Sequence, residues 1–163
     1  MQNERYKKDT LIYLSALQLM SVIIKPVAVA AAGMIDPQTQ KAWRSEFGQP
    51  GKVPLALIVN SLIELTELQP LRAILQETNK LLHWGYYLAF HRQNLAGTTD
   101  TLCKYTWQAY LHLEARDIEG FSTYLAICFS YILETIRDFI IQHGLQEAAK
   151  LATPYKIPDL NIK

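Results

Sequence analysis

The sequence has few of the residues that hold small proteins together covalently or through a metal. Its 163 residues include only two cysteines, Cys103 and Cys128, which lie 25 positions apart. This spacing excludes both a disulfide framework and a CxxC zinc site. A chain of this length buries about 70% of its unfolded surface on folding, so a core can form without either. No repeat, low-complexity segment or domain boundary is present, and we expect a single domain over 1–163.

The chain also lacks an excess of charge of either sign. Sixteen Lys and Arg residues face fifteen Asp and Glu residues, which leaves a net charge of +1. This balance excludes a strongly basic nucleic-acid binder, although a local basic stripe remains compatible with it. Charged residues make up 19% of the chain and hydrophobic residues 50%. That composition excludes disorder as the dominant state.

Motifs for hydrolysis, phosphate binding and metal binding are absent from the sequence. There is no Gly-x-Ser-x-Gly elbow, and no glycine cluster precedes a Lys-Ser or Lys-Thr pair. No Glu-x-x-His is present, and no two histidines are four residues apart. We therefore expect no metal and no cofactor. The four histidines are His83, His91, His112 and His143.

One long apolar run, from Leu11 to Ile35, resembles a signal sequence or a membrane span. Lys25 and Pro26 divide it into pieces of fourteen and nine residues, whereas a span needs about 20 apolar residues. In a signal sequence, the residues just before the cleavage site are uncharged. Lys25 lies in the corresponding region of this chain, which argues against a signal sequence. We predict a buried core helix, no membrane contact and a cytoplasmic protein.

Proline, glycine and capping residues divide the chain into predicted helices with short connections. Asp36 followed by Pro37 is typical of a helix start, and Asp9 or Thr10 could cap the first helix. Gly144 predicts the end of the sixth helix. We predict an all-α bundle of about six helices, followed by a short helix over 146–152 and an extended tail over 153–163. The six predicted helices cover about 10–34, 37–47, 54–68, 70–95, 101–115 and 120–144.

The helical period is clearest in the sixth predicted helix. Its apolar residues recur at steps of three and four, which places them on one face. We expect this face to lie in the core. Its members are Phe121, Tyr124, Leu125, Cys128, Ile132, Ile136, Phe139 and Ile140.

The same helix carries a candidate catalytic pattern, Arg137-Asp138 followed by His143. An arginine can hold a phosphate through two hydrogen bonds, and a histidine can transfer a proton. The pattern resembles the signature of the HEPN ribonucleases, which are metal-independent helical bundles. The resemblance implies that Arg137 and His143 converge on the scissile phosphate and that Asp138 assists. On a straight helix, however, Arg137 and His143 are about 120° apart, which argues against a shared phosphate.

Basic residues are scattered singly over several predicted helices, with tryptophans and tyrosines nearby. Cations and aromatic rings in one groove can follow a single nucleic-acid strand. The alternative is a salt-bridged surface above an aromatic core. The residues that we expect to contact a nucleic-acid backbone are Lys41, Arg44, Arg72, Lys80 and Arg92.

The size, the helical content and the lack of motifs resemble the small helical subunits of CRISPR effector complexes. The resemblance implies a role in antiviral defence, protein partners, and contact with nucleic-acid backbone through scattered Lys and Arg. The high apolar fraction also favours helix faces that meet a partner. We therefore predict a non-catalytic interaction subunit. A HEPN-type ribonuclease is the first alternative, and a helical pocket for a hydrophobic small molecule, lined by Tyr and Trp, is the second.

Overall fold

The computed structural model is all helical where it describes the chain, which confirms the predicted fold class. It describes the backbone of residues 2–49, 54–86 and 98–152, and the side chains of residues 11–49, 54–82, 100–138, 141 and 142. The predicted tail over 153–163 lies outside this part. The helices are α1 (Gln2–Ala31), the 3-10 helix η1 (Ala32–Met34), α2 (Pro37–Glu46), α3 (Leu55–Glu64), α4 (Gln69–Tyr86), α5 (Thr98–Glu114) and α6 (Ile118–Ala152).

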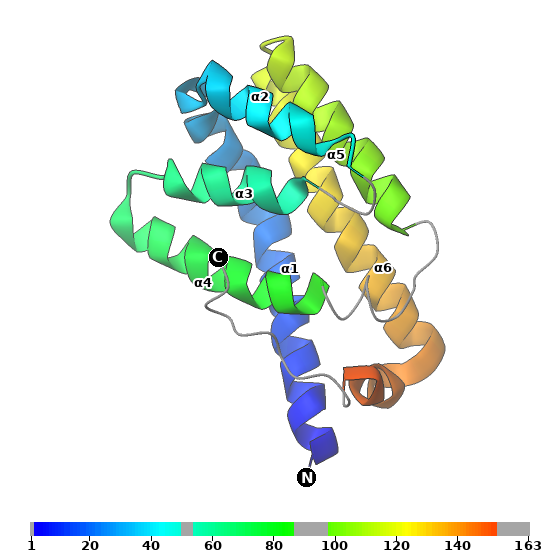
Figure 1. The fold of residues 1–163 in the computed structure, drawn as a ribbon. Coiled ribbons are helices and arrows are strands. Elements are labelled where there is room, and N and C mark those ends of the chain that lie inside the picture. Colours follow the sequence, from blue (N-terminus) through cyan, green and yellow to red (C-terminus); the bar gives the residue numbers. More distant parts are fainter. Residues whose placement is uncertain (1, 50–53, 87–97, 153–163) are drawn as a thin grey trace.

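Helices α1 and α6 are the longest and form the centre of the bundle (Figure 1). They make the most extensive contact between any two helices, and α5 packs along α6. Helices α3 and α4 lie next to each other and cross α1. Phe47, the residue that follows α2, packs against α5, and the centroids of its ring and the Trp107 ring are 4.9 Å apart. Helix α1 therefore contacts α6 on one side and the α3–α4 pair on another.

The central pairing follows from two apolar faces with helical spacing. In the predicted stripe on α6, Phe121, Leu125, Cys128, Ile132 and Ile136 are buried and Tyr124 is partly buried. The side chains of Phe139 and Ile140 lie outside the described residues. One buried cluster includes residues from all six α-helices. The buried face of α1 consists of Tyr13, Ala16, Leu17, Met20, Ile24, Val27, Ala28 and Ala31.

Local signals fix the two short helices in the middle of the chain. Asp36 caps α2 as predicted, because its carboxylate accepts a hydrogen bond of 2.7 Å from the Thr39 N–H. Pro54 precedes α3, which ends at Glu64 rather than near Leu68. The carbonyl of Thr66, just after α3, accepts a hydrogen bond from Arg72 Nε at 2.8 Å.

The prediction that Asp9 or Thr10 caps the first helix is wrong, because α1 already begins at Gln2. A favourable cap contributes only about 1 kcal/mol, so a capping residue does not force a helix to begin. Pro26 also lies inside α1. The proline removes one backbone hydrogen bond, while Ile24, Val27 and Ala28 remain buried around it. Burial on both sides of the proline keeps the helix continuous.

The predicted end at Gly144 is also wrong, because α6 continues to Ala152 and includes the separate helix predicted over 146–152. A glycine inside a helix costs about 1 kcal/mol relative to alanine. The residues that follow are mostly Gln, Glu, Ala, Lys and Leu, which are strong helix formers. Their propensity offsets the glycine. The ribbon nevertheless turns sharply in this last part of α6 (Figure 1).

We predict that Ile132→Ala lowers the free energy of unfolding by about 2–5 kcal/mol, because large-to-small changes in a core leave a cavity. Ile132 is 4% exposed in the α6 stripe. Ile141→Ala is the matched control, since Ile141 lies on the same helix and is 80% exposed. Denaturant titration should show a change within about 0.5 kcal/mol for the control. Equal losses for the two variants would show that the Ile132 side of α6 does not form the core.

Candidate interaction surface

The exposed side of α1 and η1 carries no charged residue from Leu11 to Met34. The sequence contains a single charged residue in this range, Lys25. Lys25 turns to α6, where its ammonium lies 2.7 Å from Glu119 Oε1. We call the exposed residues of this range the α1 stripe. Its eleven members are Leu11, Ile12, Ser15, Gln18, Leu19, Val22, Pro26, Val29, Ala30, Gly33 and Met34.

The α1 stripe is long and continuous. Its members follow one another at steps of mostly three and four residues, so they lie along one side of the helix. From Leu11 to Gly33 the helix rises by about 33 Å at 1.5 Å per residue. Val22 is at the midpoint of this range and is 69% exposed. A surface helix of a globular protein usually presents charged residues on its outer side, whereas the described side chains of α1 present none there.

Residues 11–34 form the one described segment that is long and apolar enough to cross a membrane, judged by length and composition alone. In its most apolar window, 39% of the residues are buried inside the protein. The buried face is that of a core helix, as the sequence predicts. The α1 stripe is a second, uncharged face of the same helix, and it lies outside the core. The absence of membrane contact stays a prediction.

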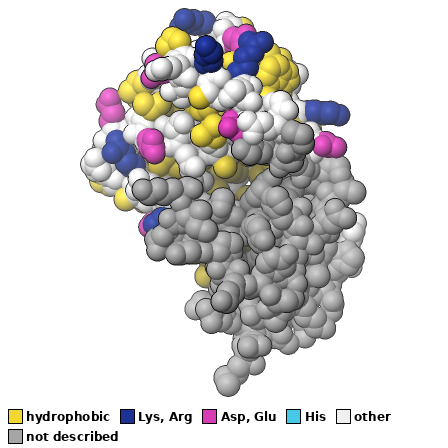
Figure 2. Space-filling view, viewed as in Figure 1, with side chains coloured by type: hydrophobic (Ala, Val, Ile, Leu, Met, Phe, Trp, Pro, Cys, Tyr) yellow, Lys and Arg dark blue, Asp and Glu magenta, His cyan; other side chains and the backbone are white. Residues whose placement is uncertain are grey.

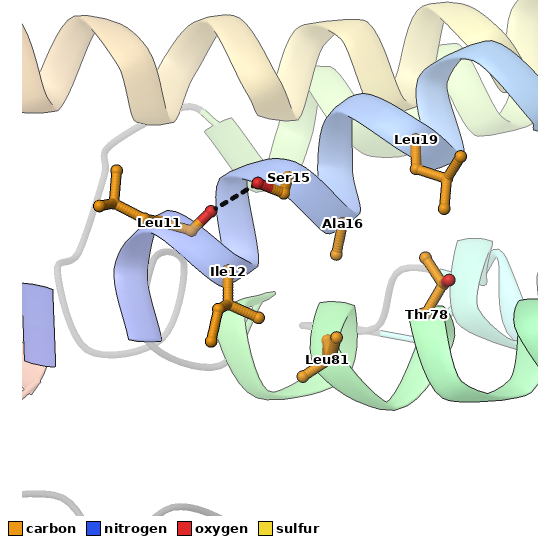
Figure 3. Close-up of a pocket in the computed structure, with 7 residues that line it drawn as sticks. All are labelled: Leu11, Ile12, Ser15, Ala16, Leu19, Thr78 and Leu81. Carbon is orange, nitrogen blue, oxygen red and sulfur yellow. Dashed lines mark hydrogen bonds between the residues drawn. The ribbon is translucent and has the colours of Figure 1, made fainter. Parts of the chain in front are cut away.

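A groove of 380 Å³ lies between α1 and α4, and four residues of the α1 stripe line one side of it (Figure 3). The Ser15 and Thr78 hydroxyls each donate to a carbonyl of their own helix, at 3.0 Å and 2.8 Å, so the groove offers no free hydroxyl proton. The rest of the lining is aliphatic and contains no Tyr or Trp, unlike the predicted small-molecule pocket. The lining residues are Leu11, Ile12, Ser15, Ala16, Leu19, Thr78 and Leu81.

Three of the predicted strand-contacting cations are engaged within the protein. Arg44 contacts both carboxylate oxygens of Glu114 at 3.2 Å, and Lys80 pairs with Glu77 at 3.2 Å. Arg72 donates to a backbone carbonyl. On the face seen in Figure 2, Lys and Arg lie singly or in small groups with Asp and Glu among them. The carboxylates offset much of the positive field that would attract a nucleic-acid strand.

These cations also lie on different helices. Lys41 is exposed beside Arg44 on α2, whereas Arg72 and Lys80 belong to α4. Arg92 lies outside the described residues. Contact with a nucleic-acid backbone stays a prediction for all five.

The HEPN-like pattern lies wholly on α6. Arg137 and Asp138 are exposed, and the side chain of His143 lies outside the described residues. Over six residues a regular helix rises by about 9 Å and turns through about 120° relative to its start. A shared phosphate would have to bridge that offset. Ribonuclease activity stays a prediction.

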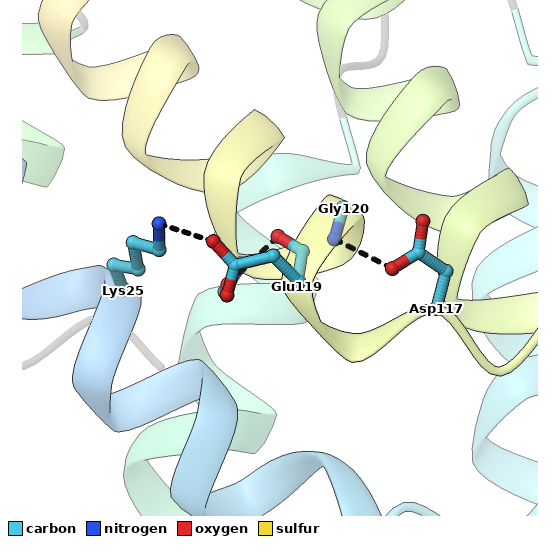
Figure 4. Close-up of polar contacts among 5 residues, drawn as sticks. Lys25, Asp117, Glu119 and Gly120 are labelled. Carbon is cyan, nitrogen blue, oxygen red and sulfur yellow. Dashed lines mark hydrogen bonds and ion pairs between the residues drawn. The ribbon is translucent and has the colours of Figure 1, made fainter.

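A polar cluster that the sequence did not single out lies at the turn between α5 and α6. Arg116 has a positive φ of 64°, and Asp117 then caps α6 by accepting a hydrogen bond of 3.0 Å from the Gly120 N–H (Figure 4). The second oxygen of Asp117 lies 2.8 Å from His112 Nδ1. A Cβ at position 120 would clash with His112 and lie 2.6 Å from Asp117 Oδ2. Because position 120 is a glycine, the His112 ring has room to contact Asp117 at this turn.

These hydrogen bonds hold the pKa of Asp117 below its ordinary value. The largest cause is the Gly120 N–H, and the contact with His112 adds to it. The His112 ring also stacks on Tyr124 with its centroid at 5.2 Å. Both oxygens of the carboxylate are therefore engaged, one by the N–H of Gly120 in the first turn of α6 and the other by His112 of α5.

The two cysteines offer little thiolate for nucleophilic chemistry. Burial raises the pKa of Cys128 to about 12 and also raises the pKa of Cys103. At neutral pH, Cys128 therefore stays protonated. Among the described residues, no group of three His, Cys, Asp or Glu side chains is placed to hold a metal ion.

Comparisons of the chain with protein-family models, with curated proteins and with solved structures found no match. The resemblances to HEPN ribonucleases and to CRISPR small subunits therefore stay predictions. The α1 stripe and the groove that it lines are the features of the described surface that the packing of the core does not explain.

We predict that Asp117→Asn makes the stability of the protein less sensitive to acid. Because the pKa of Asp117 is lowered by folding, its contribution is present above the unfolded value of about 3.9 and is lost as pH falls through the folded value. Urea unfolding at pH 7 should show the wild type as the more stable protein, and the difference should shrink at pH 3. Asp138→Asn, at an exposed site of α6, serves as the control. A difference that stays constant between the two pH values would contradict the proposed role of the cap.

Proposed function

We propose that the protein is a non-catalytic helical interaction subunit that docks onto another protein surface through the α1 stripe. The observation that carries the proposal is the run of eleven exposed residues without a charge, on a helix whose opposite face is already buried. Monomeric proteins rarely expose continuous apolar patches larger than a few hundred Å². A cover for this face therefore stabilises the protein in water.

The composition of the α1 stripe matches the centre of a protein interface. Such centres are depleted of charged residues, whereas their rims are polar. Here the ion pair of Lys25 and Glu119 lies beside the stripe, at the start of α6 (Figure 4). Apolar surface removed from water contributes about 25 cal/mol per Å². A partner that covers Leu19, Val22 and Val29 therefore gains free energy without having to desolvate a charge.

A narrower form of the proposal is a small subunit of a CRISPR effector complex that also contacts nucleic-acid backbone. It is supported by the size, the helical content and the exposed Lys41. The ion pairs of Arg44 and Lys80 count against it, because these charges are already compensated. The protein-docking role is thus the better supported of the two.

Site-specific photo-crosslinking in the cells that make the protein tests the proposal. We place benzoylphenylalanine at Val22 and, as a control, at Ile141, which is even more exposed but lies on α6. The proposal predicts discrete protein adducts from position 22, at several times the yield from position 141. The same adducts should disappear when Val29→Glu is added, since this change puts a charge into the contact.

Three results would contradict the proposal. Equal yields from the two positions would remove the special role of the α1 stripe. Adducts with lipid alone would make the stripe a membrane-contacting face. Adducts with nucleic acid instead of protein would promote the strand-binding alternative.

A further inference from the structure

We draw no further inference here: the strongest candidate, the α1 stripe together with the groove that it lines between α1 and α4, carries none because nothing in the structure shows what covers it.

Discussion

The packing of α1 against α6 is the contact on which the rest of the bundle depends. The apolar face of α1 from Tyr13 to Ala31 packs against the apolar face of α6 from Phe121 to Ile136. Helices α3 and α4 then cross α1, and α5 follows α6. Without this central pair the shorter helices would have no common surface to cover, and helices of their length are marginally stable in water on their own.

Helix α1 contributes to the core and also leaves an uncharged face exposed to water. Residues 11–34 are apolar almost all round, but the bundle covers only one of their faces. The outer face is free of charge because Lys25 turns to Glu119 on α6. One segment therefore supplies both a face of the core and the uncharged outer face on which the proposed docking role rests. A change that made the outer face polar should leave the α1–α6 contact intact.

Much of the fold could be predicted from the sequence, because helical period and capping act locally. The buried face of α6 and the Asp36 cap of α2 follow directly from spacing and residue type. The ends of α1 and α6 could not be predicted in this way. Asp9 and Gly144 carry terminus signals of only about 1 kcal/mol, which neighbouring helix formers and tertiary packing outweigh.

The candidate site was harder to predict, for a physical reason. In a segment that is apolar all round, the period does not say which face the core will cover, so the α1 stripe has no distinct signature in the sequence. The ion pair of Arg44 with Glu114 joins residues 70 positions apart. The sequence therefore does not indicate that the charge of Arg44 is compensated. The contact of His112 with Asp117 is local, but the positive φ of Arg116 that allows it is rare for a residue other than glycine.

The central claim is that the α1 stripe is covered when the protein is in its working state. Hydroxyl-radical footprinting, read by mass spectrometry, tests this claim most directly because it reports exposure residue by residue. We compare the protein in the cells that make it with the dilute purified chain, in which no partner is present. Oxidation at Leu11, Leu19, Val22 and Val29 should be several-fold lower in the cells. It should be the same in both samples at Leu57, Leu68 and Ile141, which are exposed on other parts of the molecule. Equal oxidation of the α1 residues in the cells and in the purified chain would contradict the account.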